Sequence, residues 1–267
     1  MEEWVCFKTG RYRLEPLARG GVADLALGYH ESDGSAVTFK FLKPQLARVP
    51  HLVGQLQLEY AVMLGSRPGL PQAVECGIYG GRPYLAYRYV RGVSVRHLLD
   101  ALHRAGRVPC ESTARRIVHG AACALNALHR GRPPVAHGDL SPENVIVGRR
   151  MGVALVDLGC ARRLDRPTAD APLLMGKPRY LSPEQARGEP WGAPSDVYQL
   201  GLLLYEIVTG EPLIAPWLEV PSPAEAAAPS LEALSALPPA LRLLCRRMLD
   251  PDPAARPGAA AVARALR

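Results

Sequence analysis

The sequence predicts an α+β fold, in which a strand-rich first third is followed by a larger helical part. Segments that read as strands joined by short turns dominate the first ninety residues, whereas helical segments dominate the rest. The chain has 267 residues, of which 48% are hydrophobic, so it is globular and can bury a sizeable core. A run of strands followed by a run of helices is typical of the α+β class.

The strand-rich part is expected to hold five strands and one helix. Turn residues separate the first strands, with Gly20 and Gly21 at one turn and Ser32 to Gly34 at the next. The helix is predicted over Pro50–Leu64, and residues 90–93 resemble a hinge. The predicted strands cover residues 12–18, 24–30, 36–42, 72–79 and 82–90.

The remaining residues are expected to form mainly helices. Residues 111–130 place Ile117, Ala121, Leu125 and Leu128 on one face, as an amphipathic helix does. Residues 194–210 are apolar nearly all round, which predicts a buried helix. Two further helices are predicted over 237–250 and 258–267. A Pro/Ala-rich stretch at residues 221–230 is interpreted as a loop.

Composition limits the class of protein. Apolar runs are broken well before 18 residues, so no membrane-spanning helix is expected, and the acidic start does not resemble a signal peptide. Six scattered cysteines without a CxxC pair favour reduced thiols in a cytoplasmic protein over a zinc site or a disulfide framework. The net charge of +7 fits a nucleic-acid surface, but anionic nucleotides or acidic partners explain it equally well. We expect neither a nucleic-acid nor a membrane partner.

The segment HGDLSPENVIV, residues 137–147, followed by VDLG, residues 156–159, carries the strongest chemical signal. Asp139 could orient a hydroxyl nucleophile, while Asn144 and Asp157 offer the oxygen ligands that Mg²⁺ prefers. An acid, an amide and a second acid at this spacing are what metal-assisted phosphoryl transfer requires. The alternative for this segment taken alone is a polar turn between two buried strands.

Several ordered motifs together make the chain resemble a protein kinase catalytic domain of the bacterial serine/threonine type, from about residue 11 to the end. LARGGVADLAL, residues 17–27, stands in the place of the glycine-rich loop, although only the middle of the family's three glycines, Gly20, remains. VTFK, residues 37–40, resembles the third strand with its phosphate-binding Lys40. Glu59 is the expected partner of Lys40, because it is the only acid between Lys40 and Glu75.

The resemblance implies a bilobal kinase fold. The expected N-lobe, residues 1–90, has a small antiparallel sheet and one main helix, and the expected C-lobe, residues 91–267, is helical and carries the catalytic loop. PYLAYRYVRG, residues 83–92, resembles the strand leading to the adenine hinge, with Tyr87 guarding the back pocket. The implied cofactors are ATP and Mg²⁺. The implied nucleotide contacts are Leu17, Gly20, Gly21, Leu25, Thr38, Lys40, Arg88, Val90 and Ile146, with the backbones of Arg88 and Val90 bonding adenine.

The resemblance also assigns the catalytic roles. Asp139 is the catalytic acid/base, Asn144 and Asp157 are the metal ligands, and His137 packs beneath the DLG turn. GKPRYLSPEQ, residues 176–185, resembles the substrate-facing loop, whose Glu184 should pair with Arg256. In SDVYQLG, residues 195–201, Asp196 should hold the backbone of the catalytic loop.

Two departures from the family pattern lead to specific hypotheses. The arginine that usually precedes the catalytic acid is Gly138, and the only hydroxyl between Asp157 and Tyr180 is Thr168. Activity is therefore expected to be independent of activation-loop phosphorylation. The usual phosphate-contacting lysine is Ser141, whereas the usual threonine of the substrate loop is Lys177.

We hypothesise that Lys177 reaches back to supply the missing charge as part of the catalytic set. The alternative is a basic loop residue with no catalytic role.

The function expected from these motifs is transfer of the ATP γ-phosphoryl group to a serine or threonine hydroxyl of a protein, under the control of a possible regulatory protein partner. One alternative is a pseudokinase that binds nucleotide or partners, favoured by the degraded glycine loop. A second is a small-molecule phosphotransferase of the aminoglycoside type, which shares the HGD triplet. That class would place a further acid near Cys160 and would lack YLSPEQ, DVYQLGLLLYEIVTG and DPAARP.

Overall fold

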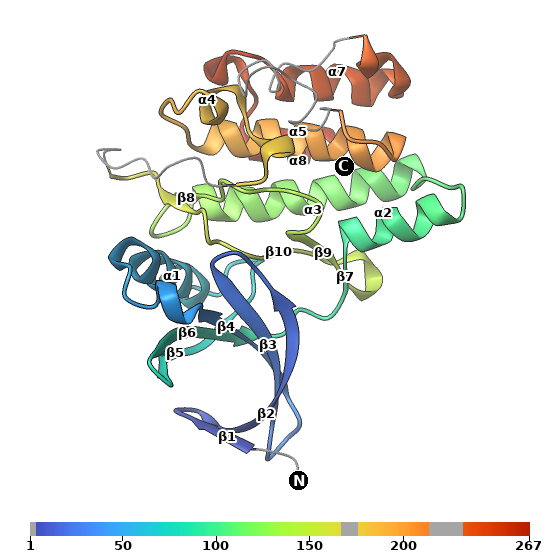
Figure 1. Ribbon diagram of the computed structural model, residues 1–267. Helices are drawn as coiled ribbons and strands as arrows, with labels where there is room; N and C mark the ends of the chain where they lie inside the picture. Colours follow the sequence, from blue (N-terminus) through green and yellow to red (C-terminus); the bar gives the residue numbers. More distant parts are fainter. Residues whose placement is uncertain (1–3, 167–175, 214–231) are drawn as a thin grey trace. The chain divides into compact units, whose positions relative to one another are not determined.

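The computed structural model describes residues 4–166, 176–213 and 232–267, and the chain divides into two compact units, Met1–Val90 and Arg91–Arg267. The first unit is built on an antiparallel sheet and the second mainly on helices (Figure 1). The α+β prediction is therefore confirmed. Thr168 and the loop predicted at 221–230 lie outside the described residues.

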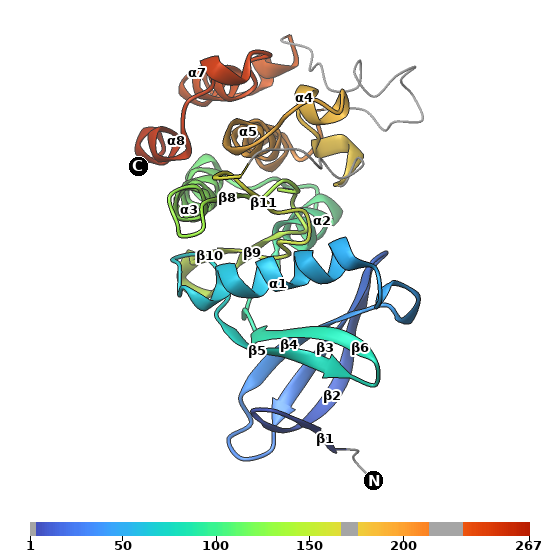
Figure 2. The ribbon, with the colours of Figure 1, turned by 90° about the vertical axis from the view of Figure 1, so that its left-hand side faces the viewer.

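The first unit contains a six-stranded sheet in the order β1-β2-β3-β4-β6-β5, antiparallel throughout. Helix α1 spans Pro50–Leu64, the predicted range, and packs on β5 and β6 (Figure 2). The strands are β1 (Trp4–Phe7), β2 (Gly10–Arg19), β3 (Ala23–His30), β4 (Ala36–Leu42), β5 (Ala73–Tyr79) and β6 (Arg82–Arg88). Strand β1 is not predicted by the sequence pattern, whereas the other five are.

An aromatic cluster gives this unit its core. Phe7 brings β1 into the cluster, with its ring centroid 4.4 Å from that of Phe39. Tyr84 donates a hydrogen bond of 2.6 Å to the buried Glu75 carboxylate, which also accepts one of 2.7 Å from the Thr9 N–H. Burial, followed by this hydrogen bond to Glu75, raises the pKa of Tyr84 above its ordinary value.

Two backbone features shape the β2–β3 hairpin that carries the glycine-rich segment. Pro16 lacks an N–H to donate, and the register of the ladder shifts between Pro16 and Ala18. At the tip, the Gly20 N–H donates to the Ala23 carbonyl at 2.9 Å. A Cβ at position 20 would lie 2.8 Å from that same oxygen, so only glycine allows this close turn.

The second unit is mainly helical, with short strands that frame its loops. Helix α3 packs against α5 and α8 (Figures 1 and 2), and every residue of α5 from Ser195 to Ile207 is buried, as its apolar sequence predicts. The helices are α2 (Val95–Arg104), α3 (Glu111–His129), α4 (Pro183–Ala186), α5 (Ala193–Thr209), α7 (Pro239–Met248) and α8 (Ala259–Ala265). Helix α2 is not predicted by the sequence pattern.

Two small antiparallel sheets complete this unit. One has the order β10-β9-β7 and the other pairs β11 with β8. The segment from residue 137 to residue 144 connects β8 to β9. The strands are β7 (Val93–Ser94), β8 (Val135–Ala136), β9 (Val145–Val147), β10 (Val153–Leu155) and β11 (Arg162–Arg163).

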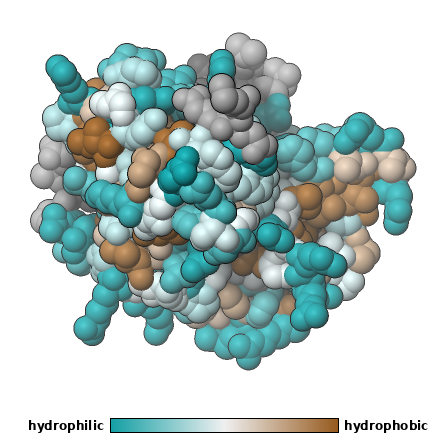
Figure 3. All heavy atoms as spheres, turned by 90° about the horizontal axis from the view of Figure 1, so that it is seen from below, coloured by the Kyte–Doolittle hydropathy of each residue, from teal (hydrophilic) through white to brown (hydrophobic). Residues whose placement is uncertain are grey.

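The surface of the described residues carries apolar side chains in separate places. Figure 3 shows one face on which hydrophobic patches are divided by hydrophilic side chains. The exposed large apolar residues are Leu17, Val22, Leu64, Ile78, Tyr79, Val93, Val108, Leu164 and Leu243. Scattered exposure of this kind is ordinary for a folded protein. Among the helices within residues 4–166, 176–213 and 232–267, none has the length and apolar character needed to cross a bilayer.

Candidate active site

The loop between β8 and β9 is held in place from α5. The Asp196 carboxylate, which is fully buried, accepts hydrogen bonds of 2.8 Å from the N–H groups of His137 and Gly138. Gln199, one helical turn later, accepts a hydrogen bond of 2.8 Å from the Leu140 N–H. Because buried N–H groups need acceptors, these contacts fix the path of the loop. The prediction that Asp196 holds this loop is confirmed.

His137 joins this loop to the VDLG segment. Its Nδ1 accepts a hydrogen bond of 3.3 Å from the Asp139 N–H, and its Nε2 lies 3.2 Å from the Val156 carbonyl oxygen. Because Nδ1 accepts, Nε2 must carry the proton and donate to that carbonyl. A neutral imidazole in one tautomer therefore links Asp139 to the residue that precedes Asp157.

Asn144 is oriented by Asp139. Its Nδ2 donates hydrogen bonds of 2.7 Å to the Asp139 carbonyl oxygen and 2.9 Å to Asp139 Oδ2. Both partners are acceptors, so the amide must present its NH₂ to them and direct Oδ1 elsewhere. The Asn144 carbonyl also accepts a hydrogen bond of 2.9 Å from the Val156 N–H, which brings Asn144 next to the strand end that carries Asp157.

Asp157 lies in a conformation that few non-glycine residues adopt. Its φ is 63°, in the left-handed region, and its Oδ1 accepts a hydrogen bond of 3.2 Å from the Gly159 N–H. Strained backbone of this kind often occurs at functional sites. The carboxylate of Asp157 and the amide oxygen of Asn144 are the kinds of ligand that a hard cation such as Mg²⁺ takes. The described ranges contain no group of three or more His, Cys, Asp or Glu side chains that could hold a metal ion.

Lys177 reaches the loop between β8 and β9. Its Nζ lies 2.9 Å from Ser141 Oγ and 3.2 Å from Asp139 Oδ2, and its backbone N–H donates to Asp139 Oδ1 at 2.9 Å. The Lys177 side chain is 37% exposed, so it is only partly enclosed by the protein. This is the arrangement that the sequence hypothesis required, although the contacts by themselves assign Lys177 no chemical role.

Gly138 has no room for a side chain. Its φ is +79°, and a Cβ there would lie 2.5 Å from Trp191 Cη2 and 2.7 Å from the Cys160 carbonyl oxygen. The Arg162 guanidinium lies over the ring of Trp191, with its Cζ 5.3 Å from the ring centroid. The indole of Trp191 therefore fills the space beside the loop where the family has an arginine. The sequence pattern gave no indication of this role for Trp191, because that residue lies far along the chain from Gly138.

Residues 176–185 are anchored in the second unit by a buried ion pair. Arg256 Nη1 and Nη2 donate to the two oxygens of Glu184 at 2.7 and 2.9 Å, and the two side chains are 0% and 3% exposed. Burial would raise the pKa of Glu184, but hydrogen bonds from Arg256 and Ser195 hold it below its ordinary value. The predicted pairing of Glu184 with Arg256 is confirmed.

In the first unit, Lys40 of β4 and Glu59 of α1 form an ion pair with a distance of 2.7 Å between Nζ and Oε2. Lys40 is 9% exposed and Glu59 is 1% exposed. A buried charge without a partner is costly, so the two side chains hold each other in place. The sequence prediction paired the same two residues.

The other predicted nucleotide contacts lie at different places in the two units. Leu25 pairs with Lys40 across the β3–β4 ladder, and the buried Thr38 pairs with Tyr87 across β4–β6. The Arg88 N–H already donates a hydrogen bond to the Gln72 carbonyl at 2.8 Å. The backbone contact with adenine that the sequence predicts at Arg88 would therefore have to use the Arg88 carbonyl oxygen.

The remaining predicted contacts are more exposed. Leu17 is 45% exposed on β2, and Gly20 and Gly21 form the hairpin tip. Val90, which follows β6, is half-buried, and Ile146, in β9 of the second unit, is also half-buried.

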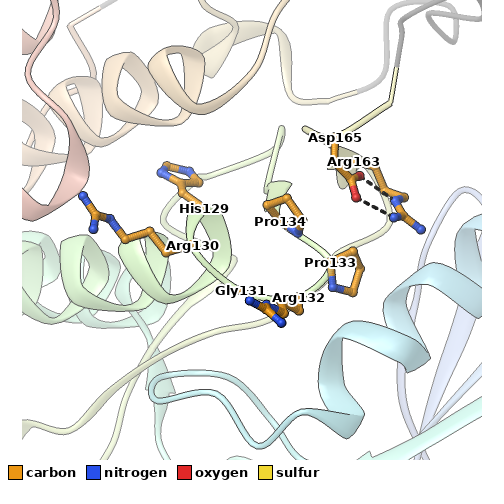
Figure 4. Close-up of a pocket in the computed structure, with 8 residues that line it drawn as sticks. All are labelled: His129, Arg130, Gly131, Arg132, Pro133, Pro134, Arg163 and Asp165. Atoms are coloured by element: carbon orange, nitrogen blue, oxygen red, sulfur yellow. Dashed lines mark hydrogen bonds and ion pairs between the residues drawn. The ribbon is translucent and has the colours of Figure 1, made fainter.

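A pocket of about 600 Å³ in the second unit contains none of the predicted site residues (Figure 4). Its wall includes His129, whose Nε2 lies 2.7 Å from Asp196 Oδ2, and an ion pair in which Arg163 binds Asp165. The pocket is lined by His129, Arg130, Gly131, Arg132, Pro133, Pro134, Arg163 and Asp165. We therefore assign the candidate active site to the Asp139 loop and its partners instead.

Comparison with known proteins gives one consistent family. The model of the protein kinase domain matches residues 12–265. The chain is 35% identical over 214 residues to the serine/threonine-protein kinase PknB of Mycolicibacterium smegmatis. This alignment covers 76% of this chain and 33% of that protein. The chain is also 29% identical over 261 residues to the probable serine/threonine-protein kinase PknB of Bifidobacterium longum. That alignment covers 91% of this chain and 37% of that protein. The chain thus spans about a third of the length of these relatives.

Proposed function

We propose a serine/threonine phosphotransferase function for this chain, which belongs to the protein kinase family. Family membership confirms the resemblance read from the motifs. The proposed reaction transfers the γ-phosphoryl group of ATP to a serine or threonine hydroxyl of a protein. The named relatives are serine/threonine-protein kinases, which supports this class of acceptor. In this proposal residues 1–90 and 91–267 act as the two lobes of one catalytic domain.

The observation that carries the proposal is the fixed Asp139 carboxylate. Its Oδ1 accepts from the Lys177 N–H, and its Oδ2 accepts from Asn144 Nδ2 and lies 3.2 Å from Lys177 Nζ. A carboxylate held this firmly can orient an acceptor hydroxyl and accept its proton, which is the role that we propose for Asp139. Catalysis of phosphoryl transfer consists mainly of positioning and electrostatic stabilisation, and this loop offers both.

We assign metal binding to Asn144 and Asp157. The orientation of the Asn144 amide directs its oxygen away from Asp139, and Asp157 contributes a carboxylate at the adjoining strand end. These are hard oxygen ligands, which fit Mg²⁺. When bound, Mg²⁺ would neutralise negative charge on the phosphates of ATP. Lys40, held by Glu59, is proposed to position those phosphates.

The remaining nucleotide contacts are proposed from the family resemblance: Leu17, Gly20, Gly21, Leu25, Thr38, Arg88, Val90 and Ile146. Lys177 is proposed to supply the positive charge that Ser141 cannot. Its Nζ is 2.9 Å from Ser141 Oγ, and both residues lie beside the Asp139 carboxylate. A cytoplasmic location and a regulatory protein partner stay predictions from the sequence.

Independence from activation-loop phosphorylation is part of the proposal. An arginine at position 138 would collide with Trp191, so the usual phosphate-binding side chain has no space there. We expect Thr168→Ala to leave the rate of substrate phosphorylation largely intact. A collapse of that rate would contradict the proposed independence.

The function is tested by incubating the protein with radiolabelled ATP, Mg²⁺ and a generic protein acceptor, with Asp139→Asn as the matched control. Labelling by the wild type alone supports the kinase. Absence of labelling together with nucleotide-dependent thermal stabilisation would support the pseudokinase alternative. A panel of aminoglycosides as acceptors tests the small-molecule phosphotransferase, which the family match disfavours.

A further inference from the structure

Helix α3 carries an exposed cysteine beside a histidine. Cys123 follows His119 by four residues, and residues at this spacing are neighbours on the surface of a helix. Cys123 Sγ lies 3.6 Å from His119 Nε2, which is within the range of a hydrogen bond to sulfur. Cys123 is exposed to solvent, whereas His119 is half-buried. Neither residue belongs to the motifs from which the kinase function is proposed.

A carbonyl group of a second helix fixes the tautomer of this histidine. Helix α8 packs against α3 (Figures 1 and 2), and His119 Nδ1 lies 2.9 Å from the Ala263 carbonyl oxygen of α8. A carbonyl oxygen accepts hydrogen bonds and cannot donate them, so Nδ1 must carry the proton of the neutral ring. Nε2 is then an acceptor, and the group within its reach is the thiol of Cys123.

The three groups form the chain of contacts by which a histidine activates a thiol. Such a chain needs a nucleophile, a base in contact with it, and a third group that orients the base. Here these are Cys123, His119 and the Ala263 carbonyl. Because the thiolate is the reactive form of a cysteine, a base that takes the proton from Sγ speeds its reactions. The exposed position of Cys123 leaves the sulfur open to a reagent from solution.

Two arginines make the surroundings of this pair positive. Arg116 precedes His119 by three residues on α3, which makes the two side chains neighbours on the helix surface. Arg264 follows Ala263 and is the charged residue within α8. Both arginines are exposed, and neither forms an ion pair with another described residue. Anionic reagents are therefore attracted to this part of the surface, and cationic ones are repelled.

We propose that Cys123 is a modification site at which anionic low-molecular-weight disulfides form a mixed disulfide, assisted by His119. Sγ attacks one sulfur of the reagent, the S–S bond of the reagent breaks, and a new S–S bond joins that sulfur to Cys123. The thiol proton passes to His119 Nε2 and then to the departing thiolate. One thiol and one disulfide are consumed and one of each is formed, so the exchange needs no further oxidant. This inference does not rest on the proposed kinase function.

An ordinary surface thiol would behave differently, because its rate would not depend on a histidine. Two other exposed cysteines, Cys6 and Cys110, serve as internal references, since neither contacts a histidine among the described residues. Hydrogen bonds from Ser112 and Thr113 lower the pKa of Cys110 to about 7, so it reacts by a route that does not involve His119.

The experiment incubates the reduced, folded protein with oxidised glutathione, whose net charge is negative, or with cystamine, which is cationic. Mass spectrometry of peptides measures the rate of mixed-disulfide formation at each cysteine. His119→Gln is the test variant, because glutamine keeps a donor for the Ala263 carbonyl but cannot take the thiol proton. His103→Gln is the matched control, since His103 is exposed and contacts no cysteine in the part of the chain that the structure describes. Arg116→Gln tests the role of charge.

At about pH 7 we expect the rate at Cys123 with oxidised glutathione to be about tenfold lower in His119→Gln than in wild type, because a free thiol is only a few per cent ionised there. At about pH 9 the solution itself removes the proton, so the difference should shrink to less than about twofold. The rates at Cys6 and Cys110 should not change, and His103→Gln should match wild type. Oxidised glutathione should react faster than cystamine at Cys123, and Arg116→Gln should reduce this preference.

Equal rates at Cys123 in wild type and His119→Gln at about pH 7 overturn the proposed assistance. A wild type that reacts faster with cystamine overturns the anionic class of reagent. If His119→Gln does not fold in a thermal unfolding assay, the pH profile of the wild type decides instead. The ratio of the rate at Cys123 to the rate at Cys6 should then fall between about pH 7 and pH 9, and a constant ratio rejects the proposal.

Discussion

Replacing Lys177 with methionine tests the chemical role of the relocated ammonium. Methionine keeps much of the length of the side chain and removes only the charge and the donors. The substitution deletes the contacts of Nζ with Ser141 Oγ at 2.9 Å and with Asp139 Oδ2 at 3.2 Å. It retains the backbone hydrogen bond from the N–H of residue 177 to Asp139 Oδ1. The position of the segment is therefore expected to survive.

The expected magnitude follows from the exposure of the Lys177 side chain. Removing one preorganised donor from an enclosed site typically reduces kcat by about 10²- to 10³-fold. Lys177 is 37% exposed, so water screens part of its effect. We therefore expect kcat to fall by about 10- to 100-fold, or about 1.4 to 2.8 kcal/mol. Because the charge should act mainly in the transition state, KM for the acceptor should change little.

The assay is steady-state phosphorylation of a protein acceptor, with Arg179→Met as control. Arg179 lies in the same segment and loses the same charge. A second test moves the charge back: the double variant Ser141→Lys with Lys177→Thr restores the residue types usual in the family. Its kcat should exceed that of Lys177→Met, because the ammonium again originates beside Asp139.

The reasoning is refuted if Lys177→Met keeps kcat within about twofold of the wild type while the protein remains folded. It is also refuted if Arg179→Met loses as much activity, since the effect would then reflect the net charge of the segment. A rise in KM without a fall in kcat would assign Lys177 to acceptor binding instead.

Three further predictions concern stability, each measured by urea unfolding. Gly138→Ala should cost about 2 kcal/mol or more, because the Cβ would lie 2.5 Å from Trp191 Cη2 at a φ of +79°; an unchanged midpoint would contradict it. Arg256→Ala should cost about 3–5 kcal/mol, because it leaves Glu184 charged and buried, and a loss below about 1 kcal/mol would be inconsistent with this. The pKa of Glu184 is held below its ordinary value of 4.5 in the folded protein. Its ionised carboxylate therefore contributes to the free energy of unfolding above pH 4.5, and this contribution is lost as pH falls through the lower folded value. Glu184→Gln should reduce the loss of stability on the acid side.

The longest elements of the fold are predictable from the sequence because their apolar patterns are strong. Helices α1, α3 and α5 lie within one residue of their expected ranges. Helix α2 is not predicted from the sequence: it has only ten residues, of which Val95 and Leu99 are buried. Strand β1 has four residues, and its place in the sheet depends on Phe7 joining an aromatic cluster formed by distant residues. Such tertiary contacts override local propensity.

The candidate site is predictable where its residues follow one another along the chain. Asp139 and Asn144 belong to a single loop, and their spacing carries the signal. Contacts between distant segments leave no such signal. Arg96 and Glu206 are 110 positions apart, so only the fold reveals that they meet. The role of Trp191 is likewise visible only in the fold. Its indole packs against Gly138, where a side chain would collide with it.

The two departures in the catalytic loop differ in physical kind. At position 138 the charged side chain of the family pattern is absent, and the Trp191 ring lies where its Cβ would be. At position 141 a charge is relocated, because Lys177 brings an ammonium to Ser141 from 36 positions away. The relocated charge reaches Asp139 only when the segment carrying Lys177 is in place. That segment is itself tied to α2 and α5 through Tyr180. Placement of the Lys177 ammonium beside Asp139 is therefore coupled to the position of residues 176–185, which supports the proposed independence from activation-loop phosphorylation.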